Sequence, residues 1–220
     1  MMRRVLLALC LWCLPVSLLQ SQQADPKRWE KAIENFEKLD RAKPFPKGGV
    51  VFTGSSSIAL WKDLGTSFPG HACLNRGFGG SQLTDVNFYV ERIVTIHQPK
   101  TVVLFCGGND LAAKRTPEQV HEAFQTFVAK VHAKLPLTKI VYISIHLPPG
   151  RIKQGAEIKK ANALIAETCK KNSSLRFLDI YPYMLGADGK PNPDLYRDPL
   201  HPNAMAYKIW AEKLAPLLKE

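Results

Sequence analysis

Beyond its first 24 residues the sequence has few cysteines and no close group of metal-binding side chains. Only Cys73, Cys106 and Cys169 lie in this part, far apart and odd in number. Such cysteines do not form a disulfide framework. Without a Cys-x-x-Cys pair or a close His/Cys cluster here, no structural metal is expected. Cys73 and Cys106 lie in apolar runs, so we expect both to be buried as small hydrophobic residues.

The chain also lacks internal repeats, low-complexity tracts and a linker that would separate a second domain. Its 220 residues, 45% of them apolar, suit one globular domain with a substantial core. The net charge is +11, but lysine and arginine are scattered and no recognition motif appears, so no nucleic-acid partner is expected. The charge favours contact with an anionic surface, such as cell-wall polymer, acidic polysaccharide or lipid headgroups. A role of the lysines in keeping the protein soluble would also explain the positive charge.

The longest apolar run lies at the N-terminus and is short for a membrane span. Residues 1–4 include two arginines and residues 5–19 are almost wholly apolar, whereas a spanning helix needs about 20 apolar residues. This pattern is typical of a secretory signal peptide. We predict a signal peptide over residues 1–24, whose loss lowers the charge from +11 to +9, and a secreted or periplasmic domain over residues 25–220. The alternative is an uncleaved signal anchor that tethers the domain to a membrane.

Apolar runs typical of buried strands alternate with helical segments along the rest of the chain. The runs occupy residues 49–53, 71–75, 101–106, 139–145 and 175–180, and helical segments occupy residues 25–42, 117–131, 156–171 and 204–218. Thr116 to Gln119 form a capping box at the start of the second helix. The alternation predicts an α/β fold, a three-layer αβα sandwich with a flavodoxin-like, five-stranded parallel sheet. In such sheets functional groups gather at the carboxyl ends of the strands.

The segment Asp198-Pro-Leu-His201-Pro-Asn places a carboxylate three residues before a histidine, with a proline beside each. An imidazole that acts as a general base needs an acceptor on its far ring nitrogen, which fixes the tautomer and stabilises the cation. A stiff turn can supply both groups from one short segment. An isolated Asp-x-x-His motif is weak support for a catalytic role, because in many proteins the aspartate is only a turn residue near a surface histidine.

Three other loops follow predicted strands and contain residues suited to acyl chemistry. Gly54 precedes three serines, where a helix N-terminus would favour developing negative charge beside a hydroxyl, although serines also cap helices. Gly79 and Gly80 would let backbone N–H groups approach a ligand, although a tight turn explains them too. Asn109 offers an amide donor of the kind whose removal from an oxyanion hole costs about 10²–10³ in turnover. Asparagine is also an ordinary turn residue.

Taken together, the four segments resemble the SGNH, or GDSL-like, hydrolase family. The resemblance covers nearly all of residues 49–220 and is most specific in its last two blocks. It implies that Ser56 is the nucleophile, His201 the general base and Asp198 its orienting partner. It also implies an oxyanion hole made of the backbone N–H groups of Ser56 and Gly80 and the side chain of Asn109.

The chain departs from the family pattern at Ser55, where an aspartate is usual. The departure leaves open which serine attacks, and it removes a carboxylate that usually braces the loop. Trp61 supports the register, since many family members have tryptophan five residues after the nucleophile. His146 and Arg151, which follow the fourth predicted strand, are expected to line the substrate pocket.

These observations predict a secreted serine esterase that uses no metal or cofactor and hydrolyses short-chain acyl esters through an acyl-enzyme. No hydrophobic insertion is evident that could form a long groove, so the expected substrates are carbohydrate or small polyol esters, either small molecules or polysaccharide. The alternatives are a lysophospholipase-type lipid acylhydrolase, acyl transfer to a sugar hydroxyl, and a non-catalytic polysaccharide-binding module that retains the fold, which Ser55 would favour. The sequence does not indicate the oligomeric state.

Overall fold

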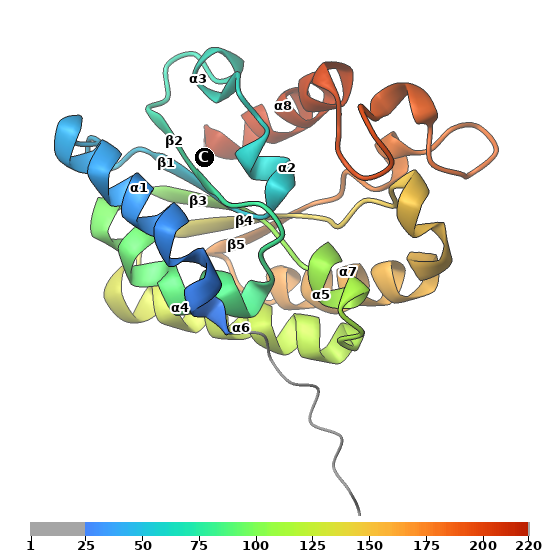
Figure 1. The fold of residues 1–220 in the computed structure, drawn as a ribbon, viewed down its shortest axis with the longest axis horizontal. Helices are drawn as coiled ribbons and strands as arrows, with labels where there is room; N and C mark the ends of the chain where they lie inside the picture. The colour runs from blue at the N-terminus through green and yellow to red at the C-terminus, as the bar shows by residue number, and fades with distance from the viewer. Residues whose placement is uncertain (1–24, 220) are drawn as a thin grey trace, which may run out of the picture.

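In a computed structural model, which describes residues 25–219, five strands form one parallel sheet (Figure 1). Their order across the sheet is β2-β1-β3-β4-β5, the order of flavodoxin-like folds. The strands are β1 (Val50–Gly54), β2 (Cys73–Gly77), β3 (Thr101–Phe105), β4 (Lys139–Ile143) and β5 (Leu175–Leu178). Because all five run in one direction, their carboxyl ends share one edge of the sheet.

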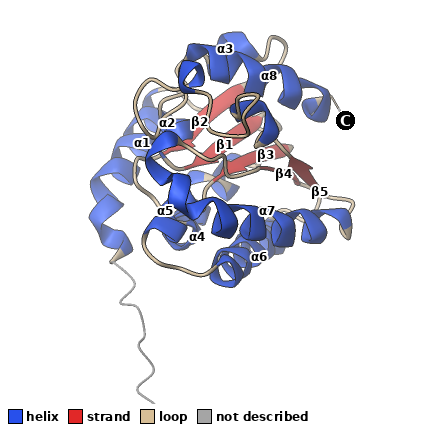
Figure 2. Cartoon of the chain, turned by 90° about the vertical axis from the view of Figure 1, so that its right-hand side faces the viewer, coloured by secondary structure: helices blue, strands red, loops and turns tan. Residues whose placement is uncertain are grey.

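Helices cover both faces of the sheet and give the molecule three layers (Figure 2). One face is covered by α1 (Glu30–Ala42), α4 (Leu83–Ile93), α6 (Pro117–Lys134) and α7 (Gly155–Lys170), with the short α5 (Gly108–Ala112) beside them. The other face is covered by α2 (Ser56–Ala59), α3 (Leu64–Ser67) and α8 (Ala204–Leu218). Short 3-10 turns complete the chain: η1 (Pro26–Trp29), η2 (Thr95–His97), η3 (Pro149–Gln154), η4 (Pro182–Met184) and η5 (Pro193–Leu195).

Alternate side chains of the central strands enter two separate cores. In β3, Val102 and Leu104 pack with α1, α4, α6 and α7, whereas Val103 and Phe105 pack with Trp210 of α8. Every residue of β1 and β3 is buried. A strand that is covered on both faces has a continuous apolar sequence, which is why these strands could be recognised in the sequence.

The α/β sandwich predicted from the sequence is confirmed, and the strand bounds agree to within two residues. Thr116 and Gln119 form the predicted capping box at the start of α6. Helix α4 was not predicted, although Leu83, Val86 and Val90 have helical spacing and are buried. Its N-cap is Gln82, paired with Asp85, so the Ser, Thr, Asp or Asn that usually marks a helix start is missing.

The three cysteines of the described residues are free thiols. Cys106 is buried, as predicted, whereas Cys73 is only half-buried because it begins the edge strand β2. Within residues 25–219, no group of three or more His, Cys, Asp or Glu side chains could hold a metal ion. In the same part of the chain, no helix has the length and apolar character needed to cross a membrane. The predicted signal peptide, residues 1–24, lies outside the described residues.

Candidate active site

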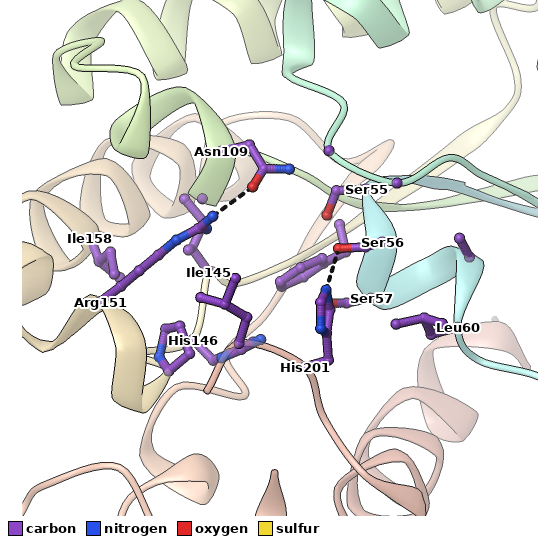
Figure 3. A pocket seen from close by; sticks show the side chains of 17 residues that line it. Ser55, Ser56, Ser57, Leu60, Asn109, Ile145, His146, Arg151, Ile158 and His201 are labelled. Atoms are coloured by element: carbon purple, nitrogen blue, oxygen red, sulfur yellow. Dashed lines mark hydrogen bonds between the residues drawn. The ribbon is translucent and has the colours of Figure 1, made fainter. Parts of the chain in front are cut away.

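The four segments singled out in the sequence meet around one cavity at the carboxyl edge of the sheet (Figure 3). The cavity has a volume of about 470 Å³. Its walls come from the β1–α2 turn, the loop after β2, α5, the segment after β4 and the turn before α8. Among the lining residues are Ser56, Gly80, Asn109, His146, Arg151 and His201. Of the predicted site residues, Asp198 alone does not line the cavity, since it lies behind His201.

Ser56 begins α2 directly after a sharp turn at the end of β1. Gly54 in this turn has a φ of 125°, and a Cβ there would lie 2.0 Å from the carbonyl oxygen of Phe105. A residue other than glycine would therefore displace the neighbouring strand. As the first residue of α2, Ser56 has a backbone N–H without an acceptor inside the helix. The turn thus places a hydroxyl and a backbone donor at the same point of the cavity wall.

Ser56, His201 and Asp198 form one chain of hydrogen bonds. Nε2 of His201 lies 3.0 Å from Oγ of Ser56, and Nδ1 lies 2.8 Å from Oδ2 of Asp198. Figure 3 shows the first of these bonds. Because the carboxylate accepts the Nδ1 proton, Nε2 keeps a lone pair that can take the Ser56 proton. Within residues 25–219 the neighbouring serines, 55 and 57, make no hydrogen bond to His201, so the geometry favours Ser56.

Asp198 is held by its own turn. Its Oδ1 accepts backbone hydrogen bonds from Leu200 at 2.8 Å and from His201 at 2.9 Å. Partial burial would raise the pKa of this carboxyl, but the two N–H groups and the imidazole outweigh it and hold the pKa below its ordinary value. The carboxylate is therefore charged at neutral pH and can orient the ring, although its side chain is 39% exposed.

Gly80 lies in the loop after β2 and is covered by a residue from the start of the domain. Its φ of 76° is a left-handed conformation that favours glycine. A Cβ on Gly80 would lie 3.3 Å from the ring of Trp29 in η1. The same ring packs edge-on against Phe78, with centroids 5.8 Å apart. Trp29 therefore supports the loop on the side away from the cavity.

The turn η1 is anchored to α4. Arg28 forms a 2.6 Å ion pair with the buried carboxylate of Asp85, which also accepts the backbone N–H of Gln82 at the start of α4. The hydroxyl of Tyr89 lies 3.1 Å from the carbonyl oxygen of Pro26. These contacts hold Trp29 in place over Gly80.

Asn109, in α5, has hydrogen bonds at both ends of its amide. Its Nδ2 donates to the carbonyl oxygen of Ser81 at 3.0 Å, and its Oδ1 accepts from Nη2 of Arg151 at 2.7 Å. The second bond is drawn in Figure 3, where the Arg151 side chain extends toward Asn109. Arg151 was predicted to bind substrate; the structure places it on the cavity wall and joins it to the amide of Asn109.

His146, which was predicted to bind substrate, lies on the cavity wall but is only 3% exposed. Its ring stacks on Phe105, with centroids 5.5 Å apart, and its Nδ1 lies 3.2 Å from the hydroxyl of Tyr196. That hydroxyl donates to the carbonyl oxygen of Leu147 at 2.9 Å, so Nδ1 of His146 must carry the proton between them. Burial lowers the pKa of His146 to about 3. The ring is therefore neutral and is not a cationic substrate ligand at ordinary pH.

Ser55 is buried, and within residues 25–219 its side chain makes no hydrogen bond that could replace a bracing carboxylate. The turn is held by other groups. The Ser55 N–H donates to Phe105 O at 3.0 Å. The carbonyl oxygen of Gly54 accepts from the N–H of Phe78 at 3.0 Å and from the hydroxyl of Ser81 at 3.1 Å. These bonds tie the turn to β3 and to the loop after β2.

The segment that carries Arg151 is joined to the turn that carries His201. The backbone N–H of Gly150 donates to the carbonyl oxygen of Pro199 at 2.8 Å. A Cβ on Gly150 would lie 3.1 Å from that oxygen, so the absence of a side chain permits the close approach.

Two residues that support the site, Trp29 and Tyr196, were not predicted from the sequence. Trp29 has helical spacing with Ile33 and Phe36, and this pattern indicates a core position without revealing the contact with Gly80. Tyr196 lies two residues before Asp198, and its nearness to that motif is the only signal in the sequence. Both contacts join segments far apart in the chain, 51 residues for Trp29 and Gly80 and 50 residues for Tyr196 and His146.

Residues 52–209 match the model of the GDSL-like lipase/acylhydrolase family. The matched range contains all the residues predicted from the resemblance: Ser56, Gly80, Asn109, Asp198 and His201. No curated protein sequence matches the chain.

Solved structures share the fold at low sequence identity. A GDSL-like lipase from Bacteroides thetaiotaomicron is 21% identical, with a TM-score of 0.74 over 85% of this chain and 97% of that chain. A carbohydrate esterase family 3 protein from Talaromyces cellulolyticus is 17% identical, with a TM-score of 0.63 over 78% of this chain and 96% of that chain. An acetyl xylan esterase is 18% identical, with a TM-score of 0.63 over 77% of this chain and 98% of that chain. At these identities the likeness shows the fold alone.

Proposed function

The chain belongs to the GDSL-like lipase/acylhydrolase family and is an acylhydrolase, and on this basis we propose that it is a secreted serine esterase that cleaves short acyl esters of carbohydrates or small polyols. The observation that carries the proposal is the hydrogen-bonded chain of Ser56, His201 and Asp198, with distances of 3.0 and 2.8 Å. Export is supported by the sequence of residues 1–24.

In the first half-reaction, Oγ of Ser56 attacks the ester carbonyl carbon while Nε2 of His201 takes the hydroxyl proton. The carbonyl oxygen becomes an oxyanion, which accepts hydrogen bonds from the backbone N–H groups of Ser56 and Gly80 and from Nδ2 of Asn109. When the carbon–oxygen bond to the alcohol breaks, His201 returns the proton to the departing oxygen. The acyl group is then bonded to Ser56.

In the second half-reaction, His201 takes a proton from water, and the water oxygen attacks the acyl carbon. The same three donors hold the new oxyanion. Its collapse breaks the bond to Ser56 Oγ, which regains a proton from His201, and the carboxylic acid leaves. Throughout, the carboxylate of Asp198 keeps the imidazole in one orientation and stabilises its cation.

The lining of the catalytic cavity supports the proposal that the acyl group of the substrate is short. Its apolar wall is made by Phe105, Ile145 and Ile158. Within residues 25–219, none of the large hydrophobic side chains that are exposed lines the cavity itself, which favours short acyl groups over long ones. The carbohydrate part of the proposal is supported by the structural likeness to an acetyl xylan esterase and a carbohydrate esterase.

The proposal is tested with 4-nitrophenyl acetate and a fluorophosphonate that labels active serines. The wild type should release 4-nitrophenol and acquire one label, which mass spectrometry should locate at Ser56. Ser56→Ala should lose both activity and label, whereas Ser55→Ala should keep the label. A label that survives Ser56→Ala refutes the assignment, and a wild type with neither hydrolysis nor label would favour the non-catalytic binding module.

A further inference from the structure

A second cavity adjoins the catalytic one, and most of the charged side chains on its walls are basic. It has a volume of about 630 Å³ and lies between residues 111–117, which join α5 to α6, and residues 150–157, which join β4 to α7. The charged residues that line it are Lys114, Arg115, Arg151, Lys153 and Glu157. Four are cations and one is an acid, and each wall contributes two of the cations. We call this cavity the basic groove.

The two lysines of the basic groove have no partner for their charge among the described residues. Within residues 25–219, Lys114 and Lys153 form no hydrogen bond or ion pair through their ammonium groups, and both residues are exposed. Arg115 uses Nε to bond Gln82 at 3.1 Å, and its two terminal nitrogens remain for other partners. Like charges that face each other across a groove repel, and an anion between the walls would turn that repulsion into attraction.

Lys114 ends the turn after α5 in an unusual backbone conformation. Its φ of 66° is left-handed, which is uncommon for a residue with a side chain and easy for glycine. The turn is held by the bond from its N–H to the carbonyl oxygen of Leu111, at 3.0 Å. A lysine therefore stands at a position where the backbone alone would favour glycine.

The basic groove adjoins the catalytic cavity, because Arg151 lines both. The groove also contains Gln154, whose Oε1 is buried and has no hydrogen-bond donor within the described residues. A hydroxyl group would satisfy this oxygen. A ligand that fits would therefore combine negative charge with hydroxyl groups, and an ester elsewhere on the same molecule would enter the adjoining catalytic cavity.

We propose that the basic groove binds the anionic part of an acylated acidic saccharide, a sugar chain that bears carboxylate or sulfate groups. Lys114 and Lys153 would contact the anionic group from opposite walls, and Gln154 would accept a sugar hydroxyl. The inference rests on the proposed esterase function, since it assigns the substrate class of the same site.

Three polymers with one backbone test the inference: acetylated dextran and its carboxymethyl and sulfate derivatives, all acetylated to the same degree. For each enzyme, kcat/KM for acetate release is divided by kcat/KM for 4-nitrophenyl acetate. The wild type is compared with Lys114→Glu/Lys153→Glu and with a matched control, Lys31→Glu/Lys38→Glu. The control changes two exposed lysines of α1 and has the same net charge.

The wild type and the control should prefer the charged polymers to neutral dextran by about tenfold, as expected when two or more exposed ion pairs act together. High salt should reduce this preference. Lys114→Glu/Lys153→Glu should lose it. A preference for one of the two charged polymers identifies the anion that the groove accepts. Equal values for the three polymers with the wild type, or an equal preference in the groove variant and the control, would overturn the inference.

Binding without catalysis separates this inference from the esterase function. Affinity electrophoresis of Ser56→Ala in unacetylated carboxymethyl-dextran and dextran sulfate should show retardation that Lys114→Glu/Lys153→Glu abolishes. If no ester is cleaved but this binding persists, the esterase proposal is wrong and the groove assignment stands. If esters are cleaved but the lysine changes leave binding unaltered, the groove assignment is wrong and the esterase proposal stands.

Discussion

Nη2 of Arg151 donates a 2.7 Å hydrogen bond to Oδ1 of Asn109, and this bond fixes which end of the amide faces the catalytic cavity. A guanidinium can only donate, so the amide oxygen must point toward it. At the other end, the carbonyl oxygen of Ser81 can only accept, so it must face Nδ2. The two bonds agree on one orientation, which leaves the second N–H of Nδ2 for an oxyanion. Arg151 is thus a positioning residue that acts through Asn109.

Asn109→Ala should lower kcat about 10²–10³-fold, because its amide bonds best to the oxyanion of the transition state. KM for 4-nitrophenyl acetate should change little. Steady-state kinetics of the purified variant check both parameters. A raised KM with an unchanged kcat would indicate that Asn109 positions the substrate instead.

Arg151→Ala should also lower kcat, by a smaller factor, because the amide of Asn109 loses one of its two anchors. In the Asn109→Ala background the same change should cost little more, since residues that act through one another are not additive. The double-mutant cycle is measured with 4-nitrophenyl acetate, which carries no anionic group for the basic groove. Additive losses would mean that Arg151 acts on the substrate directly, as the sequence predicted.

Asp198→Asn should lower turnover about 10²-fold or more while the fold survives. The amide oxygen can still accept the backbone N–H groups of Leu200 and His201, so the turn is retained, but the neutral amide no longer stabilises the imidazolium. The loss should be smaller than for His201→Ala, which removes the base itself. Kinetics together with circular dichroism check this expectation. An Asp198→Asn enzyme as active as the wild type would show that the carboxylate has no catalytic role.

Acetyl and butyryl esters of 4-nitrophenol should be cleaved much faster than esters of twelve or more carbons, because no exposed large hydrophobic side chain of the described residues lines the cavity itself. The measurement is kcat/KM across a series of acyl lengths below the micelle concentration of each ester. Rates that climb with length as far as palmitoyl esters would instead favour the lysophospholipase alternative.

The stability of the protein should fall in mild acid partly because of His146. Burial lowers its pKa in the folded state to about 3, from an ordinary value of 6.5. As pH falls from 6.5 toward 3, the unfolded chain binds a proton that the folded ring excludes. The free energy of unfolding therefore decreases by up to about 1.4 kcal/mol per pH unit from this residue, and the contribution is complete above pH 6.5.

His146→Gln should remove that slope while keeping a polar group near Tyr196. Urea denaturation at pH 7, 6 and 5 should show a shallower loss of stability for the variant than for the wild type. Parallel losses for the two proteins would contradict the assignment of a buried neutral ring.

Trp29→Ala should lower kcat more than it changes KM, because it leaves the Gly80 loop without its support. Trp29→Phe should restore part of the loss, since a smaller ring still covers the glycine. Phe36→Ala is the control: it removes an aromatic side chain from α1 that packs on the same core but lies under the guanidinium of Arg76. Phe36→Ala should destabilise the protein and leave kcat unaltered, and an equal fall in kcat for both alanine variants would mean that stability alone is responsible.

The sequence predicts those parts of the molecule whose signals are local. The buried strands form continuous apolar runs, and Asp198 and His201 belong to one short turn, so both could be recognised without a structure. The choice of Ser56 among three adjacent serines came from the family resemblance alone, because the contact between Ser56 and His201 that favours it spans 145 residues. Helix α4 was missed for another reason, since its start is capped by Gln82.

Gly150 limits how the loops of this enzyme can diverge during evolution. Its N–H and its missing Cβ bring the Arg151 segment against the carbonyl of Pro199, so the turn that carries His201 and the segment that carries the arginine are held together. Under the proposed mechanism, a substitution that displaces either part should impair both proton transfer and oxyanion binding. New substrate preferences can therefore arise more easily on walls outside this contact, of which residues 111–117 are one.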